Sequence, residues 1–440
     1  MNKTSRNILF IVFVTFFFVG APIIVLYTAG IRYDVKSGEV LKTGVISVTT
    51  TPRSANLLVN GAEINHETPY VIKNLNPGTY TVEIQKPDYH PWKSTVSVKA
   101  SETSFIQNII LFRDEPPKLR LSKLDTNISR SPNNDIIAYF KSNTEPYDLV
   151  VWDVVNNRLI KSFVVKDILD PSDYSINWSI EGKNILLKSK TTADFKVFSL
   201  ADSVVDFTKL QSPEITQVFW HPSTENILYI SSNTEMAQIN LETGDTETFT
   251  GESKNSVLVD ASLLSFFNNG AQIELRQTIG TETSLVALLP ISEYTILARH
   301  GAYLMLSDNR KELFLVNIHD KQPLLLESKA ILFDWLDSEE LLAYSDGNEI
   351  NVYDPKTHSN VFITRQAEQI TAVKWHGTGN TILATTKNSI TAIETFKAGE
   401  DRMITPLLSN VNIENFWVSN DNKLAYYFTG SDLYSLQLTK

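Results

Sequence analysis

Tryptophan recurs at a nearly constant interval through the C-terminal three quarters of this chain. Trp178, Trp220, Trp335, Trp375 and Trp417 each close a short apolar strand and precede a polar turn. The intervals between them are 42, 115, 40 and 42 residues, and 115 is close to three periods. A period of about 40 residues is typical of an architecture built from repeated units, and it constrains the fold more than any other feature.

Each period contains four short predicted strands. Residues 215–220, 227–231, 237–241 and 246–250 alternate with polar turns, and the same order recurs from residue 331. Four short antiparallel strands per period predict the blade of a β-propeller, here over residues 117–440. The innermost strands are expected to begin near Asn127, Ser175, Ile215, Val257, Tyr294, Ile331, Ile370 and Asn412. We expect eight blades, with seven as the alternative count because the fourth and fifth lack the tryptophan.

The last predicted blade ends one strand short. Residues 118–124, which precede the first blade, can supply the missing strand. Closure of this kind joins the two ends of the repeat region and removes the free sheet edges that promote aggregation. The missing strand therefore supports a circular arrangement.

The turns that follow the tryptophans carry a family resemblance. Trp178-Ser-Ile-Glu-Gly-Lys183, Trp220-His-Pro222, Trp375-His-Gly-Thr-Gly-Asn380 and Ser131-Pro-Asn-Asn134 resemble the Trp-Ser-Pro-Asp-Gly-Lys repeat of TolB-like propellers. Proline, asparagine and glycine at these positions are typical of tight turns. The resemblance implies a fold rather than an activity, and we expect the tryptophans to wedge between adjacent blades.

An uncharged apolar segment lies near the N-terminus. Residues 7–31 contain no charged side chain, and a helix of this length spans a hydrocarbon core of about 30 Å. The run is longer than the apolar core of a cleaved signal peptide, so we predict an uncleaved transmembrane helix. Lys3 and Arg6 predict a cytoplasmic tail at residues 1–6, which places the bulk of a single-pass protein of the cell membrane on the extracytoplasmic side.

Residues 44–112 alternate apolar and polar positions between strong turn signals. Asn60-Gly61 is a hairpin signal because both central positions of a type I′ turn need a positive φ. The pattern predicts a small antiparallel, immunoglobulin-like β-sandwich. We expect its large aromatic residues, Tyr80, Tyr89 and Trp92, to pack in its core.

Several motifs of this region resemble the PEGA domain. They are Pro52-Arg-Ser-Ala55, Val59-Asn-Gly61, Thr68-Pro69, Pro77-Gly-Thr-Tyr-Thr-Val82 and Lys86-Pro-Asp-Tyr-His-Pro-Trp92. Arg53-Ser54 replace the Glu-Gly after which the family is named. The resemblance implies a stalk or adhesion module of an exported protein, and it transfers no catalytic residue.

Composition and motifs exclude several classes of function. The chain has no cysteine, which excludes disulfides, thiolate metal sites and thiol catalysis. A net charge of −11 disfavours nucleic acid as a partner. None of the seven histidines has metal-ligand spacing, and no nucleophile elbow or phosphate loop occurs. The acidic runs near Asp334 and Asp421 are interpreted as solvated turns. We therefore expect no cofactor, no metal and no catalytic residue.

The candidate ligand surface is the propeller face formed by loops between second and third strands. These loops are rich in asparagine, serine and threonine, and Tyr147 is their one large aromatic residue. The candidate ligand-binding residues are Tyr147, Asn233, Asn309, Asn348 and Asn388.

The leading prediction is a non-enzymatic, membrane-anchored scaffold of the cell envelope. It is anchored in the lipid bilayer by residues 7–31 and uses the propeller to bind an envelope protein or a cell-wall glycan. The alternative is an extracytoplasmic enzyme that acts on a glycan or peptide in the central pocket. Carboxylates or histidines converging in the central channel would favour the enzyme, and aliphatic walls would favour the scaffold.

Overall fold

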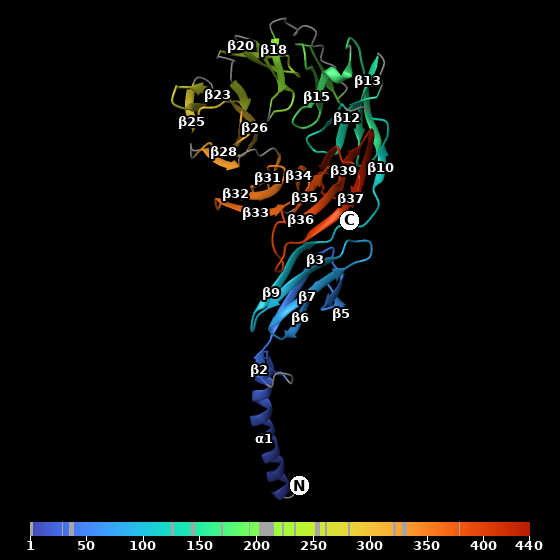
Figure 1. Cartoon of the computed structure of the whole chain (residues 1–440), viewed down its shortest axis with the longest axis vertical. Coiled ribbons are helices and arrows are strands. Elements are labelled where there is room, and N and C mark those ends of the chain that lie inside the picture. Colours follow the sequence, from blue (N-terminus) through green and yellow to red (C-terminus); the bar gives the residue numbers. More distant parts are fainter. Residues whose placement is uncertain are drawn as a thin grey trace.

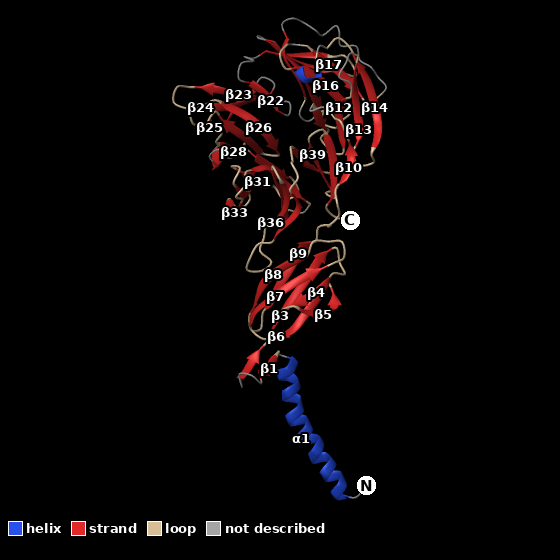
Figure 2. Cartoon of the chain, turned by 45° about the vertical axis from the view of Figure 1, so that its right-hand side comes forward, coloured by secondary structure: helices blue, strands red, loops and turns tan. Residues whose placement is uncertain are grey.

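A helix, a small sandwich and a ring of sheets follow one another along the long axis of the computed structural model (Figure 1). The structure describes residues 3–28, 30–34, 39–124, 127–141, 146–168, 170–192, 194–201, 215–221, 224–232, 235–250, 256–259, 262–279, 282–319, 323–327, 332–377 and 379–440. Apart from the N-terminal helix, the described secondary structure is almost entirely β, which confirms the predicted fold class (Figure 2).

Helix α1 (Lys3–Thr28) contains the predicted apolar segment. Its stretch from Arg6 to Tyr27 is the one helix in the described part of the chain that is long and apolar enough to cross a membrane. The helix ends before the predicted boundary at residue 31, because Gly30 adopts a φ of 76° and the chain turns there. Residues from Ile31 then form a hairpin of β1 (Ile31–Asp34) and β2 (Glu39–Lys42), which the sequence pattern did not predict.

Two packed sheets form the sandwich. One contains β3 (Gly44–Thr51), β6 (Tyr70–Leu75) and β9 (Thr103–Ile110), and the other contains β4 (Asn56–Val59), β5 (Ala62–Glu67), β7 (Gly78–Gln85) and β8 (Trp92–Val98). The predicted hairpin turn is present, with φ of 52° at Asn60 and 79° at Gly61. The expectation of a purely antiparallel sandwich was wrong, because β3 pairs with β9 in parallel. The two strands are far apart in sequence, so no local turn determines their direction.

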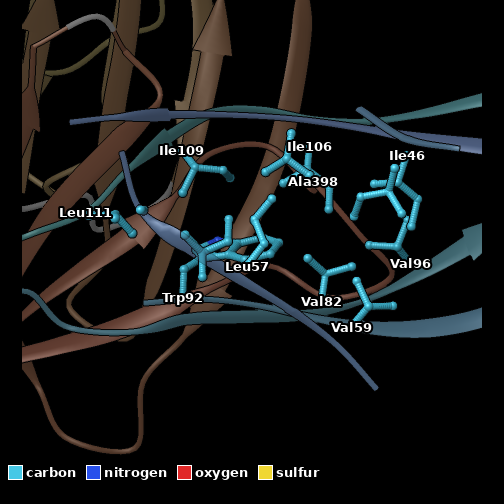
Figure 3. Packing of buried hydrophobic residues seen from close by; sticks show 14 of the residues in the cluster. Ile46, Leu57, Val59, Val82, Trp92, Val96, Ile106, Ile109, Leu111 and Ala398 are labelled. Carbon is cyan, nitrogen blue, oxygen red and sulfur yellow. The ribbon is translucent and has the colours of Figure 1, made fainter. Parts of the chain in front are cut away.

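Alternating apolar residues of both sheets meet in the sandwich core. Ile46, Leu57, Val82 and Ile106 are fully buried there (Figure 3). Tyr89 and Trp92 are also buried in this core, and the partly buried Tyr80 packs against it, which confirms that these aromatic residues serve the core.

Eight small sheets form the ring, and we number them as blades in chain order. In blades 1 to 7 the strands run in sequence order from the inside outward. Blades 1 to 4 contain β11 (Ile128–Arg130), β12 (Ile136–Phe140), β13 (Tyr147–Asp153) and β14 (Arg158–Val165); β15 (Tyr174–Trp178), β16 (Asn184–Ser189) and β17 (Phe195–Ser199); β18 (Ile215–Trp220), β19 (Ile227–Ser232), β20 (Glu235–Asn240) and β21 (Thr246–Thr250); and β22 (Ser256–Val259), β23 (Ser262–Asn268), β24 (Ile273–Ile279) and β25 (Glu282–Leu289). A 3₁₀ turn, Pro171–Asp173, precedes β15.

The remaining blades repeat this arrangement. Blades 5 to 8 contain β26 (Tyr294–His300), β27 (Tyr303–Asp308), β28 (Leu313–Asn317) and β29 (Pro323–Glu327); β30 (Leu332–Leu336), β31 (Leu341–Ser345), β32 (Glu349–Asp354) and β33 (Ser359–Arg365); β34 (Ile370–His376), β35 (Thr381–Thr386), β36 (Ser389–Glu394) and β37 (Ile404–Ser409); and β38 (Asn415–Val418), β39 (Leu424–Thr429), β40 (Asp432–Gln437) and β10 (Lys118–Leu121). The predicted closure is confirmed, because β10 pairs with β40 as the outermost strand of blade 8.

Contacts join every blade to the next. Trp220 Nε1 donates to the Asn177 carbonyl at 3.0 Å, Trp375 Nε1 to the Asp334 carbonyl at 3.1 Å, and Trp417 Nε1 to the Asn134 carbonyl at 3.1 Å. These bonds join blade 3 to 2, blade 7 to 6, and blade 8 to 1, as expected of residues wedged between blades. Five junctions remain. Four of them are made by Asn127 with Tyr174, Tyr229 with Leu263, Phe266 with Tyr294, and His300 with Trp335, and a shared apolar cluster joins blades 7 and 8. The described residues therefore form an eight-bladed β-propeller.

The same turn recurs between the first and second strands. In blades 1, 2 and 8 the serine amide donates to the carbonyl five residues on, and the serine hydroxyl accepts from the amide of that same residue. The third residue after the serine has a positive φ and is Asn134, Gly182 or Asn422. Asparagine and glycine tolerate this conformation, which explains why the turns look alike in sequence.

A loop of blade 7 docks the propeller onto the sandwich. Between β36 and β37 it places Ala398 in the sandwich core (Figure 3). Phe396 and Met403 of the same loop pack against this core. The Glu400 amide donates to the Thr95 carbonyl of the sandwich at 2.8 Å. We call residues 395–403 the docking loop. Because one of its side chains completes the core of the sandwich, the two bodies share a packed apolar interface.

Candidate functional site

Antiparallel strands give the propeller two faces, each formed by a different set of loops. We call the face with the loops between second and third strands the upper face, and it also carries the connections from one blade to the next. The lower face carries the loops between first and second and between third and fourth strands. In blades 4 to 8 the second-to-third loops lie where they were predicted, whereas the predicted loops of blades 1 to 3 lie wholly or partly outside the described residues.

The sandwich covers part of the lower face. The docking loop joins a third strand to a fourth, and a cleft of about 820 Å³ lies between Thr51, Pro52 and Asn108 of the sandwich and the first-to-second turns of blades 6, 7 and 8. The upper face therefore lies on the side of the ring opposite to the contacts with the sandwich, and access to it does not require the two bodies to separate.

Three predicted ligand residues are exposed on the upper face. Asn309 lies after β27 in blade 5, Asn348 after β31 in blade 6, and Asn388 after β35 in blade 7. Asn309 Oδ1 accepts from the Ser292 hydroxyl at 2.8 Å. The backbone amides of Asn348 and Asn388 bond to Asp346 and Thr386 within their own turns. The turns are therefore held in shape, whereas ligand binding by these residues stays a prediction.

The other two predicted residues are not presented in this way. Tyr147 begins β13 and is only 7% exposed, because its ring packs edge-on against Phe140 in the cluster between blades 1 and 2. Its expected exposure on the upper face was wrong, since a large aromatic at a strand end gains more from that apolar cluster than from solvent. Asn233 lies outside the described residues.

Two of the histidines take structural positions. His221 and His376 lie in equivalent turns, and each is only 4% exposed. His221 Nδ1 accepts a hydrogen bond from the Thr224 amide, and His376 Nε2 bonds the Asn422 carbonyl at 2.9 Å. Burial lowers the pKa of His376. Within the described ranges, no three histidine or acidic side chains form a metal-binding group.

A cavity of about 220 Å³ lies in the central channel. The innermost strands β11, β30, β34 and β38 line it, with residues Arg130, Leu332, Phe333, Thr371, Ala372, Val373, Lys374, Thr385, Ile413, Glu414, Asn415 and Phe416. Half of these lining residues are aliphatic or aromatic, and the other half are polar or charged. The aliphatic walls expected of a scaffold are therefore present in part, and the charged residues in them were not predicted. Nothing in the local sequence distinguishes them from residues on the outer strands.

One pair of charges in the channel is internally neutralised. Lys374 Nζ bonds Asp334 Oδ1 at 2.5 Å, and Asp334 Oδ2 accepts from the Trp375 amide at 2.7 Å. Asp334 was interpreted as a solvated turn residue, but it lies on β30 and holds blade 7 against blade 6. Its carboxylate is occupied by these two bonds, so it is poorly suited to serve as a catalytic base.

A buried carboxyl lies beside the docking loop. Glu394 is 7% exposed, and its Oε1 accepts from Trp92 Nε1 of the sandwich at 2.8 Å. Burial raises the pKa of Glu394 to about 7, against the opposing effects of the bonds from Trp92 and Met403 and of the Arg402 charge. Trp92 and Glu394 are 302 residues apart, so no sequence pattern could have paired them.

Comparison with known families assigns only the sandwich. Residues 43–109 match the PEGA domain model, which confirms the family resemblance of the turn motifs. No curated protein sequence matches the chain. The resemblance of the propeller turns to TolB-like proteins stays a prediction.

Solved structures with a similar fold are distant in sequence. They include a eukaryotic initiation factor, with 12% identity over 79% of this chain and 94% of that one and a TM-score of 0.49. The C-terminal WD40 domain of Sif2 is 13% identical over 74% of this chain and 99% of that one, also with a TM-score of 0.49. The propeller assignment rests on the eight sheets and the contacts between them rather than on these similarities.

Proposed function

We propose that this chain is a membrane-anchored, extracytoplasmic binding or scaffold protein whose upper propeller face recognises an envelope protein or a cell-wall glycan. In this proposal residues 7–31 lie in the bilayer, residues 44–112 form a stalk, and residues 117–440 present the binding surface. No cofactor is involved.

The observation that carries the proposal is the docking of the sandwich on the lower face. A stalk that is bound to one face leaves the opposite face open, and the shared core keeps that orientation constant. The exposed apolar side chains of α1, such as Phe10 and Phe13, need a covering that water does not supply, and a bilayer provides it. A catalytic role is not proposed, because no histidine is among the described lining residues of the cavity, Glu414 is the one carboxylate among them, and the neighbouring Asp334 is already paired.

The absence of cysteine makes the topology directly testable. We expect Asn388→Cys to react with a membrane-impermeant maleimide on intact cells, whereas Lys3→Cys reacts only after lysis. Both positions react in lysed cells, which controls for intrinsic accessibility. Labelling of Lys3→Cys on intact cells, with protection of Asn388→Cys, would contradict the proposed orientation.

The upper face is tested by site-specific photo-crosslinking in cells. Photoreactive residues at Asn348 and Asn388 should give a shared set of adducts. Asn420, which is exposed in a lower-face turn of blade 8, is the matched control and should not give that set. Adducts from Asn420 alone would assign recognition to the lower face and overturn the proposal.

A further inference from the structure

Arg130 has a fixed position in the central channel. It is the last residue of β11, and its guanidinium lies over the ring of Trp417, 5.4 Å from the ring centroid. Trp417 is 1% exposed and is held by its bond to the Asn134 carbonyl. The ring therefore supports one face of the guanidinium and leaves its edge, where the N–H groups lie, available to a ligand.

The positive charge of Arg130 has no partner among the described residues. No described carboxylate lies within ion-pair distance of its guanidinium, although the Asp334 charge acts on it electrostatically. Asp334 is already bonded to Lys374 and to the Trp375 amide. Burial lowers the pKa of Arg130, yet an arginine stays charged at neutral pH. A partly buried cation without a counter-ion is costly, so the site favours an anion.

The cavity beside Arg130 limits the size of that anion. A volume of about 220 Å³ holds a single side chain or a chain terminus, but not a folded segment. Phe333, Val373 and Phe416 give it apolar walls suited to an aliphatic stem. The Thr371 hydroxyl is already bonded to Thr385, so the described lining offers few partners for the many hydroxyls of a sugar acid.

Glu414 limits the charge of the ligand. It precedes β38 and is exposed on the upper side of the channel, where its Oε1 accepts from Asn412 Nδ2 at 2.9 Å and from the Gly430 amide at 3.3 Å. Lys374 and Asp334 cancel each other, so one positive charge at Arg130 and one negative charge at Glu414 remain. Because Glu414 repels added negative charge, a doubly charged phosphate is disfavoured more strongly than a monoanion held at Arg130.

We propose that the central channel binds a carboxylate group carried by a peptide, either an acidic side chain or a C-terminus, through the edge of the Arg130 guanidinium. Two parallel N–H···O bonds to one carboxylate are the geometry that arginine favours. The site rests on the channel residues alone, so it stands or fails independently of the recognition face.

Binding of short peptides to the full chain in zwitterionic nanodiscs tests the proposal. The probes are acetyl-Gly-Gly-Glu-amide, acetyl-Gly-Gly-Gly with a free C-terminus, and acetyl-Gly-Gly-Gln-amide. We expect dissociation constants of about 1 mM or tighter for at least one carboxylate peptide and no binding of the glutamine peptide. The first two peptides distinguish a side chain from a C-terminus as the source of the carboxylate.

Variants of Arg130 then locate the site. Arg130→Gln should weaken binding by about tenfold or more, and Arg130→Lys should retain part of it because lysine keeps the charge but not the fork of donors. Arg299→Gln, a matched loss of charge on the innermost strand of blade 5, should have no effect. If Arg130→Gln fails to fold, two measurements still test the proposal. They are the affinity of the Arg130→Lys variant and the difference between glutamate and glutamine peptides in binding to the wild-type protein.

Two outcomes would overturn the proposal. One is equal binding of the three peptides, or no binding of either carboxylate peptide. The other is that inorganic phosphate binds as tightly as the better carboxylate peptide, and that the Glu414→Gln substitution leaves the affinity for phosphate unchanged. Either outcome leaves the crosslinking pattern of the upper face unaffected, so the two proposals fail separately.

Discussion

At the residue scale, Glu394 couples the stability of the protein to pH. The folded state keeps its proton up to a pKa of about 7, whereas the unfolded chain loses it near 4.5. The folded state therefore binds more protons between these values, and the free energy of unfolding falls as pH rises through that window. The shift corresponds to about 3 kcal/mol.

Glu394→Gln should remove this dependence. The amide oxygen still accepts from Trp92 Nε1 but does not ionise, so we expect a flatter stability profile between pH 5 and 8 and a higher melting temperature than wild type at about pH 8. Thermal unfolding across this pH range checks it. Glu400→Gln, an exposed carboxyl of the docking loop, is the control and should keep the wild-type slope. If the melting temperature of Glu394→Gln fell with pH as steeply as that of wild type, Glu394 would not be the group that couples stability to pH.

Trp417 is a second residue whose role can be isolated. Trp417→Phe removes the bond to the Asn134 carbonyl between blades 8 and 1 and leaves a gap in a fully buried site, at a cost of about 2–4 kcal/mol. Trp178→Phe should cost about 1 kcal/mol, because the buried Trp178 Nε1 has no acceptor in the described part of the chain. Urea unfolding measures both, and equal losses would argue against a specific role for this closure bond.

At the element scale, the docking loop depends on a close approach of two backbones. A Cβ on Gly399 would lie 2.3 Å from Ser94 Oγ and 2.4 Å from the Thr95 carbonyl oxygen. Because a strand carbonyl cannot move away cheaply, Gly399→Ala should destabilise the interface by about 1–3 kcal/mol. Lys397→Ala, an exposed position of the same loop, should change stability by less than about 0.5 kcal/mol.

Limited proteolysis distinguishes loss of docking from general unfolding. Gly399→Ala should expose the docking loop to cleavage while both fragments stay resistant, since each body keeps most of its own core. Uniform degradation would instead mean that the sandwich and propeller do not fold separately.

The elements themselves were largely predictable, because their signals are local. Eight innermost strands begin within a few residues of the predicted positions, and the positive φ of Asn134, Gly182 and Asn422 explains the repeated turns. The fourth and fifth blades lack the tryptophan, yet their four-stranded pattern was sufficient. The parallel pairing of β3 with β9 was not predictable, since no turn connects these strands directly.

At the scale of the whole molecule, sequence periodicity and chain length determined a ring closed by β10, and hydropathy determined one apolar helix ahead of it. These are properties that repeat or that depend on neighbouring residues. The burial of Tyr147, the pairing of Trp92 with Glu394 and the position of the Arg130 charge, which has no partner among the described residues, were decided only by tertiary structure. Each depends on which distant strands meet, and such meetings follow from packing around the whole ring rather than from any local pattern of residues.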